Sequence, residues 1–283
     1  MTATTKLRLG LIGDNIARSR SPLLHRLAGD QNGVAVTYDP LVPKVLGETF
    51  EQVFARCQNG GYRGINVTYP YKEHVVPSLR IDDPLVRAIG AANTVVFEED
   101  GPVGYNTDYS GFVAAYKSVR QDADTGPVLM IGTGGVGRAV AFGLVALGTK
   151  DLRLVDRDMA KAEVLAEALR LAAPDMQVTT YDDPTRAAEG AAGLINCTPV
   201  GMVGYEGTPL PRAAMAGAEW AFDAVYTPVE TQFLQDAFSE DLSIISGWNL
   251  FFFQGVHAWH FFTGLPLNEA QLRDDLLQSK ETS

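Results

Sequence analysis

Short apolar runs alternate along the chain with longer segments of helical spacing, and turns rich in glycine, proline and asparagine separate them. Such a run is typical of a buried strand, and repeated alternation of strands with helices is typical of an open α/β sheet. In the first part of the chain we expect strands at residues 7–12, 37–41 and 65–67, a helix from Pro22 and another at 46–57. Strands at 91–97 and 103–105 flank an acidic turn and predict a hairpin.

The stretch of residues 64–74 contains the first candidate for chemistry. Its strand ends in polar positions, and Pro70 suits the first turn of a following helix, because a proline there lacks no needed N–H. Lys72 is then expected just inside that helix. A cation at the positive end of the helix dipole is unfavourable, so we expect this lysine to have a function.

The second part of the chain repeats the alternation after a polar segment at 121–126. We expect strands at 128–131, 152–155, near Val178, at 193–196 and at 220–223. Helices are expected at 138–147, 161–171 and, in an aromatic-rich segment, 248–262. No internal repeat or low-complexity segment interrupts this pattern.

Composition and charge narrow the class of protein. The chain has 283 residues, enough for two domains, and a formal net charge of −11, which argues against nucleic acid or an anionic membrane as a partner. The four histidines and two cysteines show no metal-ligand spacing, so we predict no metal and two reduced thiols. The N-terminus lacks the apolar core of a signal peptide and no apolar run is long enough to span a membrane, which predicts a cytoplasmic protein.

A glycine motif follows the strand at 128–131. Gly132, Gly134 and Gly137 form GxGxxG between a predicted strand and a predicted helix, which is the context that the dinucleotide-binding motif requires. The first glycine permits the tight turn, the second lets the backbone approach a pyrophosphate, and the third lets helix and strand pack closely. A flavodoxin-like unit with a glycine turn is the alternative.

Asp156 ends the next predicted strand, where a carboxylate can bind both ribose hydroxyls of NAD. The 2′-phosphate of NADP would meet this like charge at short range, which costs several kcal/mol at intermediate dielectric. Arg157 is adjacent and could turn toward a phosphate. We therefore predict NAD in preference to NADP.

Polar residues also gather at predicted strand ends in the first part of the chain. They are Asn66, Thr68, Lys72, Asn93 and Asp108. Ligands of open α/β sheets bind at the carboxyl ends of strands. A helix start would disfavour the charged form of Lys72, and Asp108 would favour it. The two together could therefore take a proton from a ligand hydroxyl while a hydride leaves the carbon that carries this hydroxyl. The alternatives are a structural ion pair and ordinary turn residues.

Ser19 and Ser21 alternate before a predicted helix, so both hydroxyls could face a ligand carboxylate; the alternative is helix capping by Ser21. With these residues in place, the chain resembles the shikimate dehydrogenase family over nearly its whole length. The resemblance rests on motifs at 19–22, 64–73, 89–94, 104–111, 132–137, 196–202 and 223–231, and on Gln254.

The resemblance implies an N-terminal open α/β substrate domain, a Rossmann-fold dinucleotide-binding domain and an active site in the interdomain cleft. We expect the substrate-binding and catalytic domain at 1–110 and 246–283, and the NAD-binding domain at 111–245. The resemblance further implies that Lys72 and Asp108 are catalytic. The implied substrate-binding residues are Ser19, Ser21, Thr68, Asn93, Tyr226 and Gln254. The implied cofactor-binding residues are Gly132, Gly134, Gly135, Val136, Gly137, Asp156, Arg157 and Thr198.

Departures from the family pattern bear on the substrate. The stretch around Asp156 is similar to the NAD-using quinate/shikimate branch, Arg20 stands between the two serines and is expected in solvent, and Asn249 replaces a glycine. The implied reaction is reversible NAD-dependent oxidation of the C3 hydroxyl of shikimate, quinate or an amino-substituted analogue. An NADP-dependent biosynthetic shikimate dehydrogenase and a non-catalytic sensor of dinucleotide or ring acid are the alternatives. We expect a small carboxylate substrate, and a monomer or a homodimer.

Overall fold

The computed structural model describes residues 6–279, and the chain divides into two compact units. The first unit contains the residues up to Thr107 together with those from Gln254 onward, and the second is Asp108–Phe253. The outer ends of the predicted ranges 1–110 and 246–283, and the N-terminal residues 1–5 discussed above, lie outside the described residues. Both units consist of strands and helices, which confirms the predicted α/β class.

The first unit is built on a five-stranded mixed sheet of order β2-β1-β3-β4-β5. β1, β2 and β3 are parallel, whereas β4 runs antiparallel to both β3 and β5, which confirms the predicted hairpin. The strands are β1 (Lys6–Ile12), β2 (Ala35–Leu41), β3 (Gly64–Val67), β4 (Thr94–Glu98) and β5 (Gly101–Tyr105). The helices are α1 (Ser21–Gln31), α2 (Pro43–Leu46), α3 (Phe50–Asn59), the 3-10 turn η1 (Val76–Ser78), α4 (Pro84–Ile89) and α11 (Glu269–Gln278).

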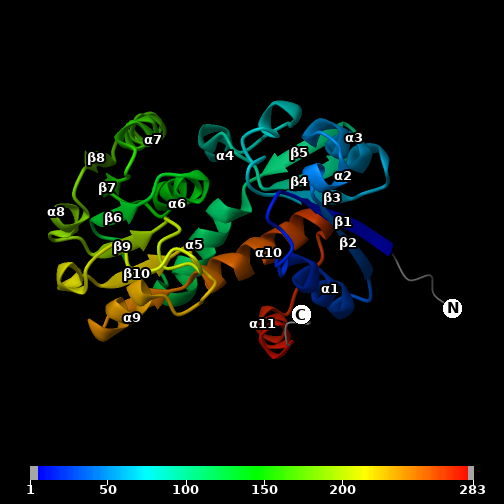
Figure 1. Ribbon diagram of the computed structural model, residues 1–283. Coiled ribbons are helices and arrows are strands. Elements are labelled where there is room, and N and C mark those ends of the chain that lie inside the picture. The colour runs from blue at the N-terminus through cyan, green and yellow to red at the C-terminus, as the bar shows by residue number, and fades with distance from the viewer. Residues whose placement is uncertain (1–5, 280–283) are drawn as a thin grey trace. The chain divides into compact units, whose positions relative to one another are not determined.

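Apolar side chains cover both faces of this sheet. On one face Ile65 and Val95 pack with Phe54 of α3, and on the other Leu9 and Val96 pack with residues of α10 (Gly247–Thr263). Figure 1 shows α3 on one side of the strands and α1 with the end of α10 on the other. The loops at the carboxyl ends of β1 and β3 are therefore carried by a rigid core.

The helix expected from Pro70 is wrong. Residues 69–75 form a series of turns, and only the short η1 follows. Pro77 explains the failure, because a proline in the middle of a helix lacks the N–H and clashes with the carbonyl four residues earlier. Lys72 thus lies in a turn, and the helix start that we expected to act on it is not there.

The helix expected at 46–57 starts later than predicted, because α2 ends at Leu46 and α3 begins at Phe50. Gly47 ends α2 in the left-handed conformation with φ of 67°. Thr49 then starts α3 with a capping box, in which its side chain accepts from Gln52 N–H and the Gln52 side chain accepts from Thr49 N–H.

The second unit has a six-stranded parallel sheet of order β11-β10-β9-β6-β7-β8. Counted from β6 along the chain, this is the strand order 3-2-1-4-5-6 of a dinucleotide-binding Rossmann fold. The strands are β6 (Val128–Ile131), β7 (Asp151–Val155), β8 (Gln177–Tyr181), β9 (Gly193–Asn196), β10 (Trp220–Asp223) and β11 (Ser243–Ile245). The helices are α5 (Thr107–Arg120), α6 (Gly135–Ala146), α7 (Met159–Ala172), α8 (Pro184–Ala188), η2 (Arg212–Met215) and α9 (Gln232–Ser239).

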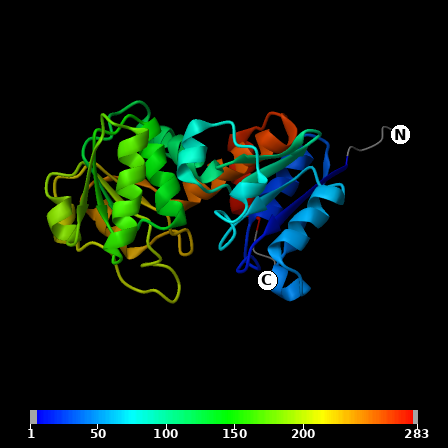
Figure 2. The same ribbon diagram turned by 90° about the horizontal axis from the view of Figure 1, so that it is seen from above.

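Helices cover both faces of this second sheet. α6 and α7 lie side by side over one face, and α9 lies on the other (Figures 1 and 2). Leu129, Leu194 and Ala221 form the core on the α8–α9 side, whereas Phe222 contacts Phe112 of α5 with ring centroids 5.0 Å apart. The buried strands explain why their near-continuous apolar runs could be read from the sequence.

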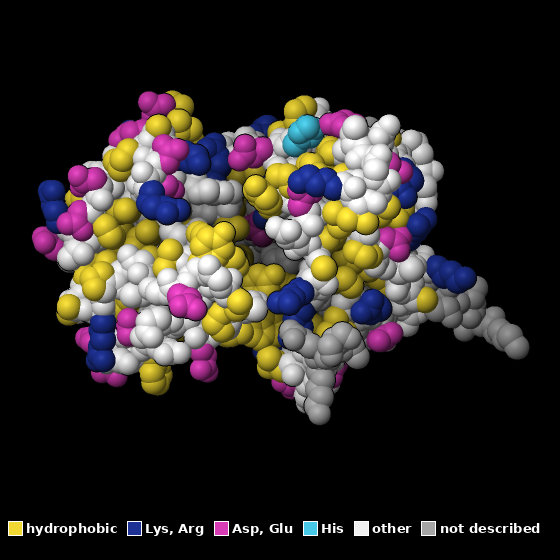
Figure 3. Space-filling view, viewed as in Figure 1, with side chains coloured by type: hydrophobic (Ala, Val, Ile, Leu, Met, Phe, Trp, Pro, Cys, Tyr) yellow, Lys and Arg dark blue, Asp and Glu magenta, His cyan; other side chains and the backbone are white. Residues whose placement is uncertain are grey.

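Within residues 6–279, no helix is long and apolar enough to cross a membrane, and no group of three or more His, Cys, Asp or Glu side chains could hold a metal ion. On the face shown in Figure 3, basic side chains are interspersed with acidic ones. The predictions of no metal, no nucleic acid and a monomer or homodimer stay predictions.

Candidate functional site

The loop between β6 and α6 has the backbone geometry that a pyrophosphate needs. Gly132 has φ of +98°, where a side chain is strained, and a Cβ on Gly137 would lie 2.1 Å from the Gly132 carbonyl oxygen. Gly134 and Gly135 face open space instead, since a Cβ on either would meet nothing within 4 Å. The N-terminus of α6, which starts at Gly135, is therefore accessible to an anion, and its unpaired N–H groups would hold one. These residues fit a bound dinucleotide.

Asp156 lies at the carboxyl end of β7 and joins this loop. Its Oδ2 accepts hydrogen bonds from the Thr133 N–H (2.7 Å) and hydroxyl (2.8 Å), and its Oδ1 accepts from the Asp158 N–H (2.9 Å). Burial alone would raise the pKa of Asp156, but these hydrogen bonds outweigh it and hold the pKa below its ordinary value. The side chain is therefore a fixed carboxylate beside the glycine loop, whereas Arg157 is exposed.

Thr198 follows β9 and belongs to a buried network that the sequence did not single out. Its hydroxyl donates to Asn196 Oδ1 (2.7 Å), and Asn196 Nδ2 donates to Asp223 Oδ1 (3.0 Å). The Asp223 carboxylate also accepts from the Val225 N–H (2.9 Å) and from the Thr231 hydroxyl (2.6 Å). The network thus ties the loop of Thr198 to the segment after β10.

Burial raises the pKa of Asp223 to about 6, although the hydrogen bonds from Thr231, Val225 and Asn196 oppose the rise. The signal for this network was present in the sequence, since Asn196 and Asp223 end two neighbouring apolar strands. Only the pairing of the strands shows that the two side chains meet.

In the first unit, Thr68, Lys72 and Asn93 come together at one edge of the sheet through backbone hydrogen bonds. The Thr68 N–H donates to the Ile12 carbonyl (2.9 Å), and the Ala92 N–H donates to the Lys72 carbonyl (2.9 Å). The Val67 N–H donates to the Asn93 carbonyl (2.9 Å). The turn that carries Lys72 is therefore fixed to the residues that precede β4.

A buried polar network lies beneath this edge. Asn66 is its centre: its Oδ1 accepts from the Tyr38 hydroxyl (2.8 Å) and its Nδ2 donates to the Thr94 hydroxyl (3.0 Å). Asn93 Oδ1 accepts from the Thr94 hydroxyl (3.1 Å), from the Thr107 hydroxyl (3.1 Å) and from the Thr107 N–H (2.7 Å). Asn93 is thus a buried and rigidly oriented amide rather than an ordinary turn residue.

Tyr38 extends the network toward the serine pair, and the sequence analysis missed it. Burial raises the pKa of Tyr38 far above its ordinary value, while a hydrogen bond with Ser21 opposes the rise, so the hydroxyl stays protonated. Its ring stacks on His25, with centroids 5.2 Å apart, and burial lowers the pKa of His25 to about 3. Nothing local in the sequence indicated the polar contacts of these two residues.

Ser19 and Ser21 lie on either side of Arg20 at the start of α1. The alternative that Ser21 caps this helix is wrong, because the N-cap position is Arg20 and no side chain caps it. The Ser21 N–H instead donates to Ser19 Oγ (3.3 Å), so the two serines form one small turn. The expectation that Arg20 points into solvent is wrong as well, since its guanidinium donates to carbonyls at the end of α11.

The remaining predicted residues are placed as follows. Gln254 lies on α10 in the first unit, next to Gly255, whose added Cβ would meet the Leu24 side chain of α1 at 2.4 Å. Asp108 is in the first turn of α5 and is 8% exposed, directly after Thr107 of the buried network. Tyr226 belongs to the second unit, where its ring stacks on Phe251 with centroids 5.9 Å apart.

The side chain of Asn249 is hydrogen-bonded to the start of its own helix. Its Oδ1 accepts from the Ser246 hydroxyl (2.6 Å) and from the Ser246 N–H (3.2 Å). The amide oxygen of this departure from the family pattern therefore caps α10.

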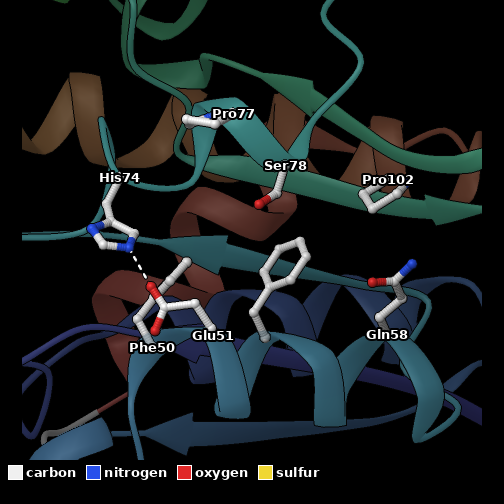
Figure 4. Close-up of a pocket in the computed structure, with 8 residues that line it drawn as sticks. Phe50, Glu51, Gln58, His74, Pro77, Ser78 and Pro102 are labelled. Atoms are coloured by element: carbon white, nitrogen blue, oxygen red, sulfur yellow. Dashed lines mark hydrogen bonds and ion pairs between the residues drawn. The ribbon is translucent and has the colours of Figure 1, made fainter.

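A separate pocket of about 600 Å³ lies in the first unit. Figure 4 shows it between α3 and the segment of η1 and β5, with the Phe50 side chain, the His74–Glu51 pair and Ser78 around it. His74 Nε2 lies 2.5 Å from Glu51 Oε1. None of the predicted site residues lines this pocket, although His74 follows Lys72 closely in the chain.

Comparisons with known proteins identify the family of this chain. Residues 11–95 match the model of the shikimate dehydrogenase substrate binding domain. The chain is 36% identical to the quinate/shikimate dehydrogenase (NAD(+)) of Corynebacterium efficiens, over 95% of this chain and 97% of that protein. It is 35% identical to the shikimate dehydrogenase (NADP(+)) of Pseudarthrobacter chlorophenolicus, over 97% and 96%.

The fold is similar to that of solved relatives. The quinate dehydrogenase from Corynebacterium glutamicum in complex with NAD superimposes with a TM-score of 0.91, at 32% identity, over 97% of this chain and 100% of that one. Both the sequence and the fold are thus shared along almost the entire chain. The chain belongs to the shikimate dehydrogenase family.

Proposed function

We propose that the protein is an NAD-preferring dehydrogenase that reversibly oxidises the C3 hydroxyl of shikimate, quinate or a close analogue to the 3-dehydro compound. Membership of the family supports the reaction class. The observation that carries the cofactor preference is the fixed, ionised carboxylate of Asp156 beside the open glycine loop. Its free edge would accept the ribose hydroxyls of NAD.

The same carboxylate would oppose NADP. Two unit charges about 5 Å apart interact by about 3 kcal/mol at an effective dielectric of ~20, and partial exposure of Asp156 reduces this figure. We expect a penalty of about 1.5–3 kcal/mol, which corresponds to about a 10- to 100-fold preference for NAD. Asp156→Ser should therefore raise relative activity with NADP by about this factor.

We assign the substrate to the first unit. Ser19 and Ser21 would donate hydrogen bonds to the carboxylate, and Thr68 and Gln254 would bind ring hydroxyls. Asn93 would donate from its NH2 group, since its Oδ1 already accepts three hydrogen bonds. Tyr226 is proposed as a further contact of the carboxylate.

Lys72 and Asp108 would perform the proton transfer. NAD bound at the glycine loop supplies the hydride acceptor. As the hydride leaves C3, the Lys72 amine would take the proton of the C3 hydroxyl, and the Asp108 carboxylate would stabilise the resulting ammonium. The backbone hydrogen bond from the Ala92 N–H to the Lys72 carbonyl supports this role, because it holds the segment of Lys72 against the turn of Asn93.

The experiment that tests the proposal is a steady-state matrix of shikimate and quinate, each with NAD and NADP, followed by absorbance of the reduced cofactor. Turnover that is strong with NAD and weak with NADP supports the proposal and identifies the substrate. Lys72→Ala and Lys72→Arg serve as matched variants, one without the amine and one with a retained charge. Both should lose kcat by at least about 100-fold, because neither can take the proton near neutral pH.

An NADP-dependent biosynthetic shikimate dehydrogenase is the second candidate. It is favoured by the exposed guanidinium of Arg157 beside Asp156, and by the near-equal similarity to a relative named for NADP(+). A preference for NADP that Arg157→Ala abolishes would establish it. Absence of turnover in all four combinations would instead favour a different ring acid or a non-catalytic sensor.

A further inference from the structure

Arg20 makes the longest-range contact at the start of α1. Its terminal nitrogen donates to the Leu276 carbonyl (2.5 Å) and to the Ser279 carbonyl (3.3 Å), both at the C-terminal end of α11. The last carbonyls of a helix have no partner within the helix and carry the negative end of its dipole. A guanidinium is the group that satisfies them best, because its donors are charged and fixed in a plane.

The segment that carries the serines has few other anchors. Five other helices, α3, α4, α8, α9 and α11, start with a side chain that accepts a backbone N–H, whereas α1 has no such cap. The local hydrogen bonds run from the Ser19 N–H to the Ile16 carbonyl (3.0 Å), from the Leu24 N–H to the Arg20 carbonyl (3.0 Å) and from the Ser21 N–H to Ser19 Oγ (3.3 Å). The Arg20 side chain joins this turn to α11, and the hydrogen bond between Ser21 and Tyr38 joins it to β2.

We propose that Arg20 is a positioning residue, which sets the two serine hydroxyls by holding their turn against the end of α11. The proposal rests on the proposed function, in which these serines bind the substrate carboxylate. Arg20 sits between them in the chain, so a shift of its backbone moves both hydroxyls. Since its guanidinium is engaged with α11, it acts on the carboxylate through the serines and not by direct contact.

A matched control exists in the same unit. Arg63 also donates to a carbonyl near the C-terminal end of a helix, from its Nε to the Phe262 carbonyl of α10 (2.9 Å), and from a terminal nitrogen to the Phe97 carbonyl (3.2 Å). It lies before β3 and does not adjoin the serine turn. Loss of Arg63 therefore removes a similar helix contact without freeing the serines.

The experiment compares Arg20→Ala, Arg20→Lys and Arg63→Ala with the natural chain. Two quantities are measured: KM and kcat for the ring acid that the natural chain turns over, and hydrogen exchange of the peptide that spans residues 13–24. We expect Arg20→Ala to raise KM by about tenfold, with kcat within about threefold, and to speed exchange of this peptide, because a charge-assisted hydrogen bond is lost. Arg20→Lys should restore KM to within about threefold, since an ammonium can donate to the same carbonyls.

The outcomes separate this proposal from the proposed function. If Arg20→Ala leaves KM unchanged, or if Arg63→Ala raises it equally, the positioning role is overturned while the dehydrogenase remains. If the natural chain turns over neither acid, the proposed function fails, and the exchange measurement alone decides. Faster exchange in Arg20→Ala than in Arg63→Ala then supports the positioning of the serine turn, and equal exchange overturns it.

Discussion

Replacing Tyr38 by phenylalanine removes one oxygen from the buried network of the first unit. The Tyr38 hydroxyl donates to Asn66 Oδ1 (2.8 Å), and the two residues are both 6% exposed, so water cannot easily take its place. His25 also hydrogen-bonds to Asn66, so the loss of the Tyr38 donor should cost an amount within the range of about 1–3 kcal/mol that applies to a buried acceptor. Asn66 cannot turn to recover the loss, because its Nδ2 donates to the Thr94 hydroxyl. We therefore expect the free energy of unfolding to fall by about 2 kcal/mol.

The loss should also reach the substrate, since the same hydroxyl contacts Ser21 and Asn66 supports the turn of Asn93. We expect KM for the ring acid to rise by about three- to tenfold with a smaller change in kcat, measured by steady-state kinetics. Urea denaturation and hydrogen exchange of peptides from β2 and β3 report the stability of this unit. Because the protein has two units, the exchange data locate the loss.

Tyr62→Phe is the matched control for this prediction. The Tyr62 hydroxyl donates to Asp39 Oδ2 (2.6 Å) in the same unit, but this carboxylate is 30% exposed and water can replace the donor. The control should cost about 1 kcal/mol or less and leave KM unchanged. The reasoning is refuted if Tyr38→Phe destabilises no more than Tyr62→Phe, or if it leaves KM at the natural value.

Further predictions concern the second unit. The pKa of Asp223 is raised from 3.8 to about 6, so the folded state keeps a proton that the unfolded state releases; this contribution is full below pH 3.8 and is lost as pH rises through 6, by up to about 3 kcal/mol. Asp223→Asn should lack this pH-dependent loss of stability. Urea melts between pH 4.5 and 7.5 measure the free energy of unfolding of the variant and of the natural chain. A difference between the two that stays constant over this range would contradict the prediction. Gly137→Ala should lower both the thermal midpoint and NAD affinity, because its Cβ meets the Gly132 carbonyl oxygen at 2.1 Å. Gly134→Ala should weaken NAD binding without lowering the thermal midpoint, since its Cβ meets no protein atom. A fluorescence melt gives the midpoint and a fluorescence titration gives the NAD affinity. Equal thermal midpoints for the two variants would contradict the predicted difference in stability.

Five of the six strands of the second unit could be predicted from the sequence because their signals are local, whereas β11, α5, α8 and α9 were not predicted. β6, β9 and β10 coincide with their predicted bounds, since each is an apolar run that ends at a polar residue or a glycine. The roles of the glycines also follow from spacing, and the space around Gly134 and Gly137 agrees with them. Fully buried parallel strands leave little ambiguity in such patterns.

The first unit was harder, because its site depends on contacts between distant residues. The turn of Lys72 is held by Ala92, and Pro77 prevents the helix that Pro70 suggested. Arg20 meets a carbonyl 256 positions away in the chain, so no local pattern could reveal its role. The proposed catalytic and binding roles stay predictions until the variants above are measured.

The division of the chain has a consequence for synthesis on the ribosome. The first unit needs α10, whose Ala258 and Phe262 pack with Leu9, Leu11 and Val96 over one face of its sheet. These residues leave the ribosome only after Asp108–Phe253, a segment that is continuous in the chain and forms the second compact unit. The five strands made first therefore keep part of this apolar face uncovered until α10 has been made. The last helices act as a late closing step, so the protein can become complete only after its dinucleotide unit has been made.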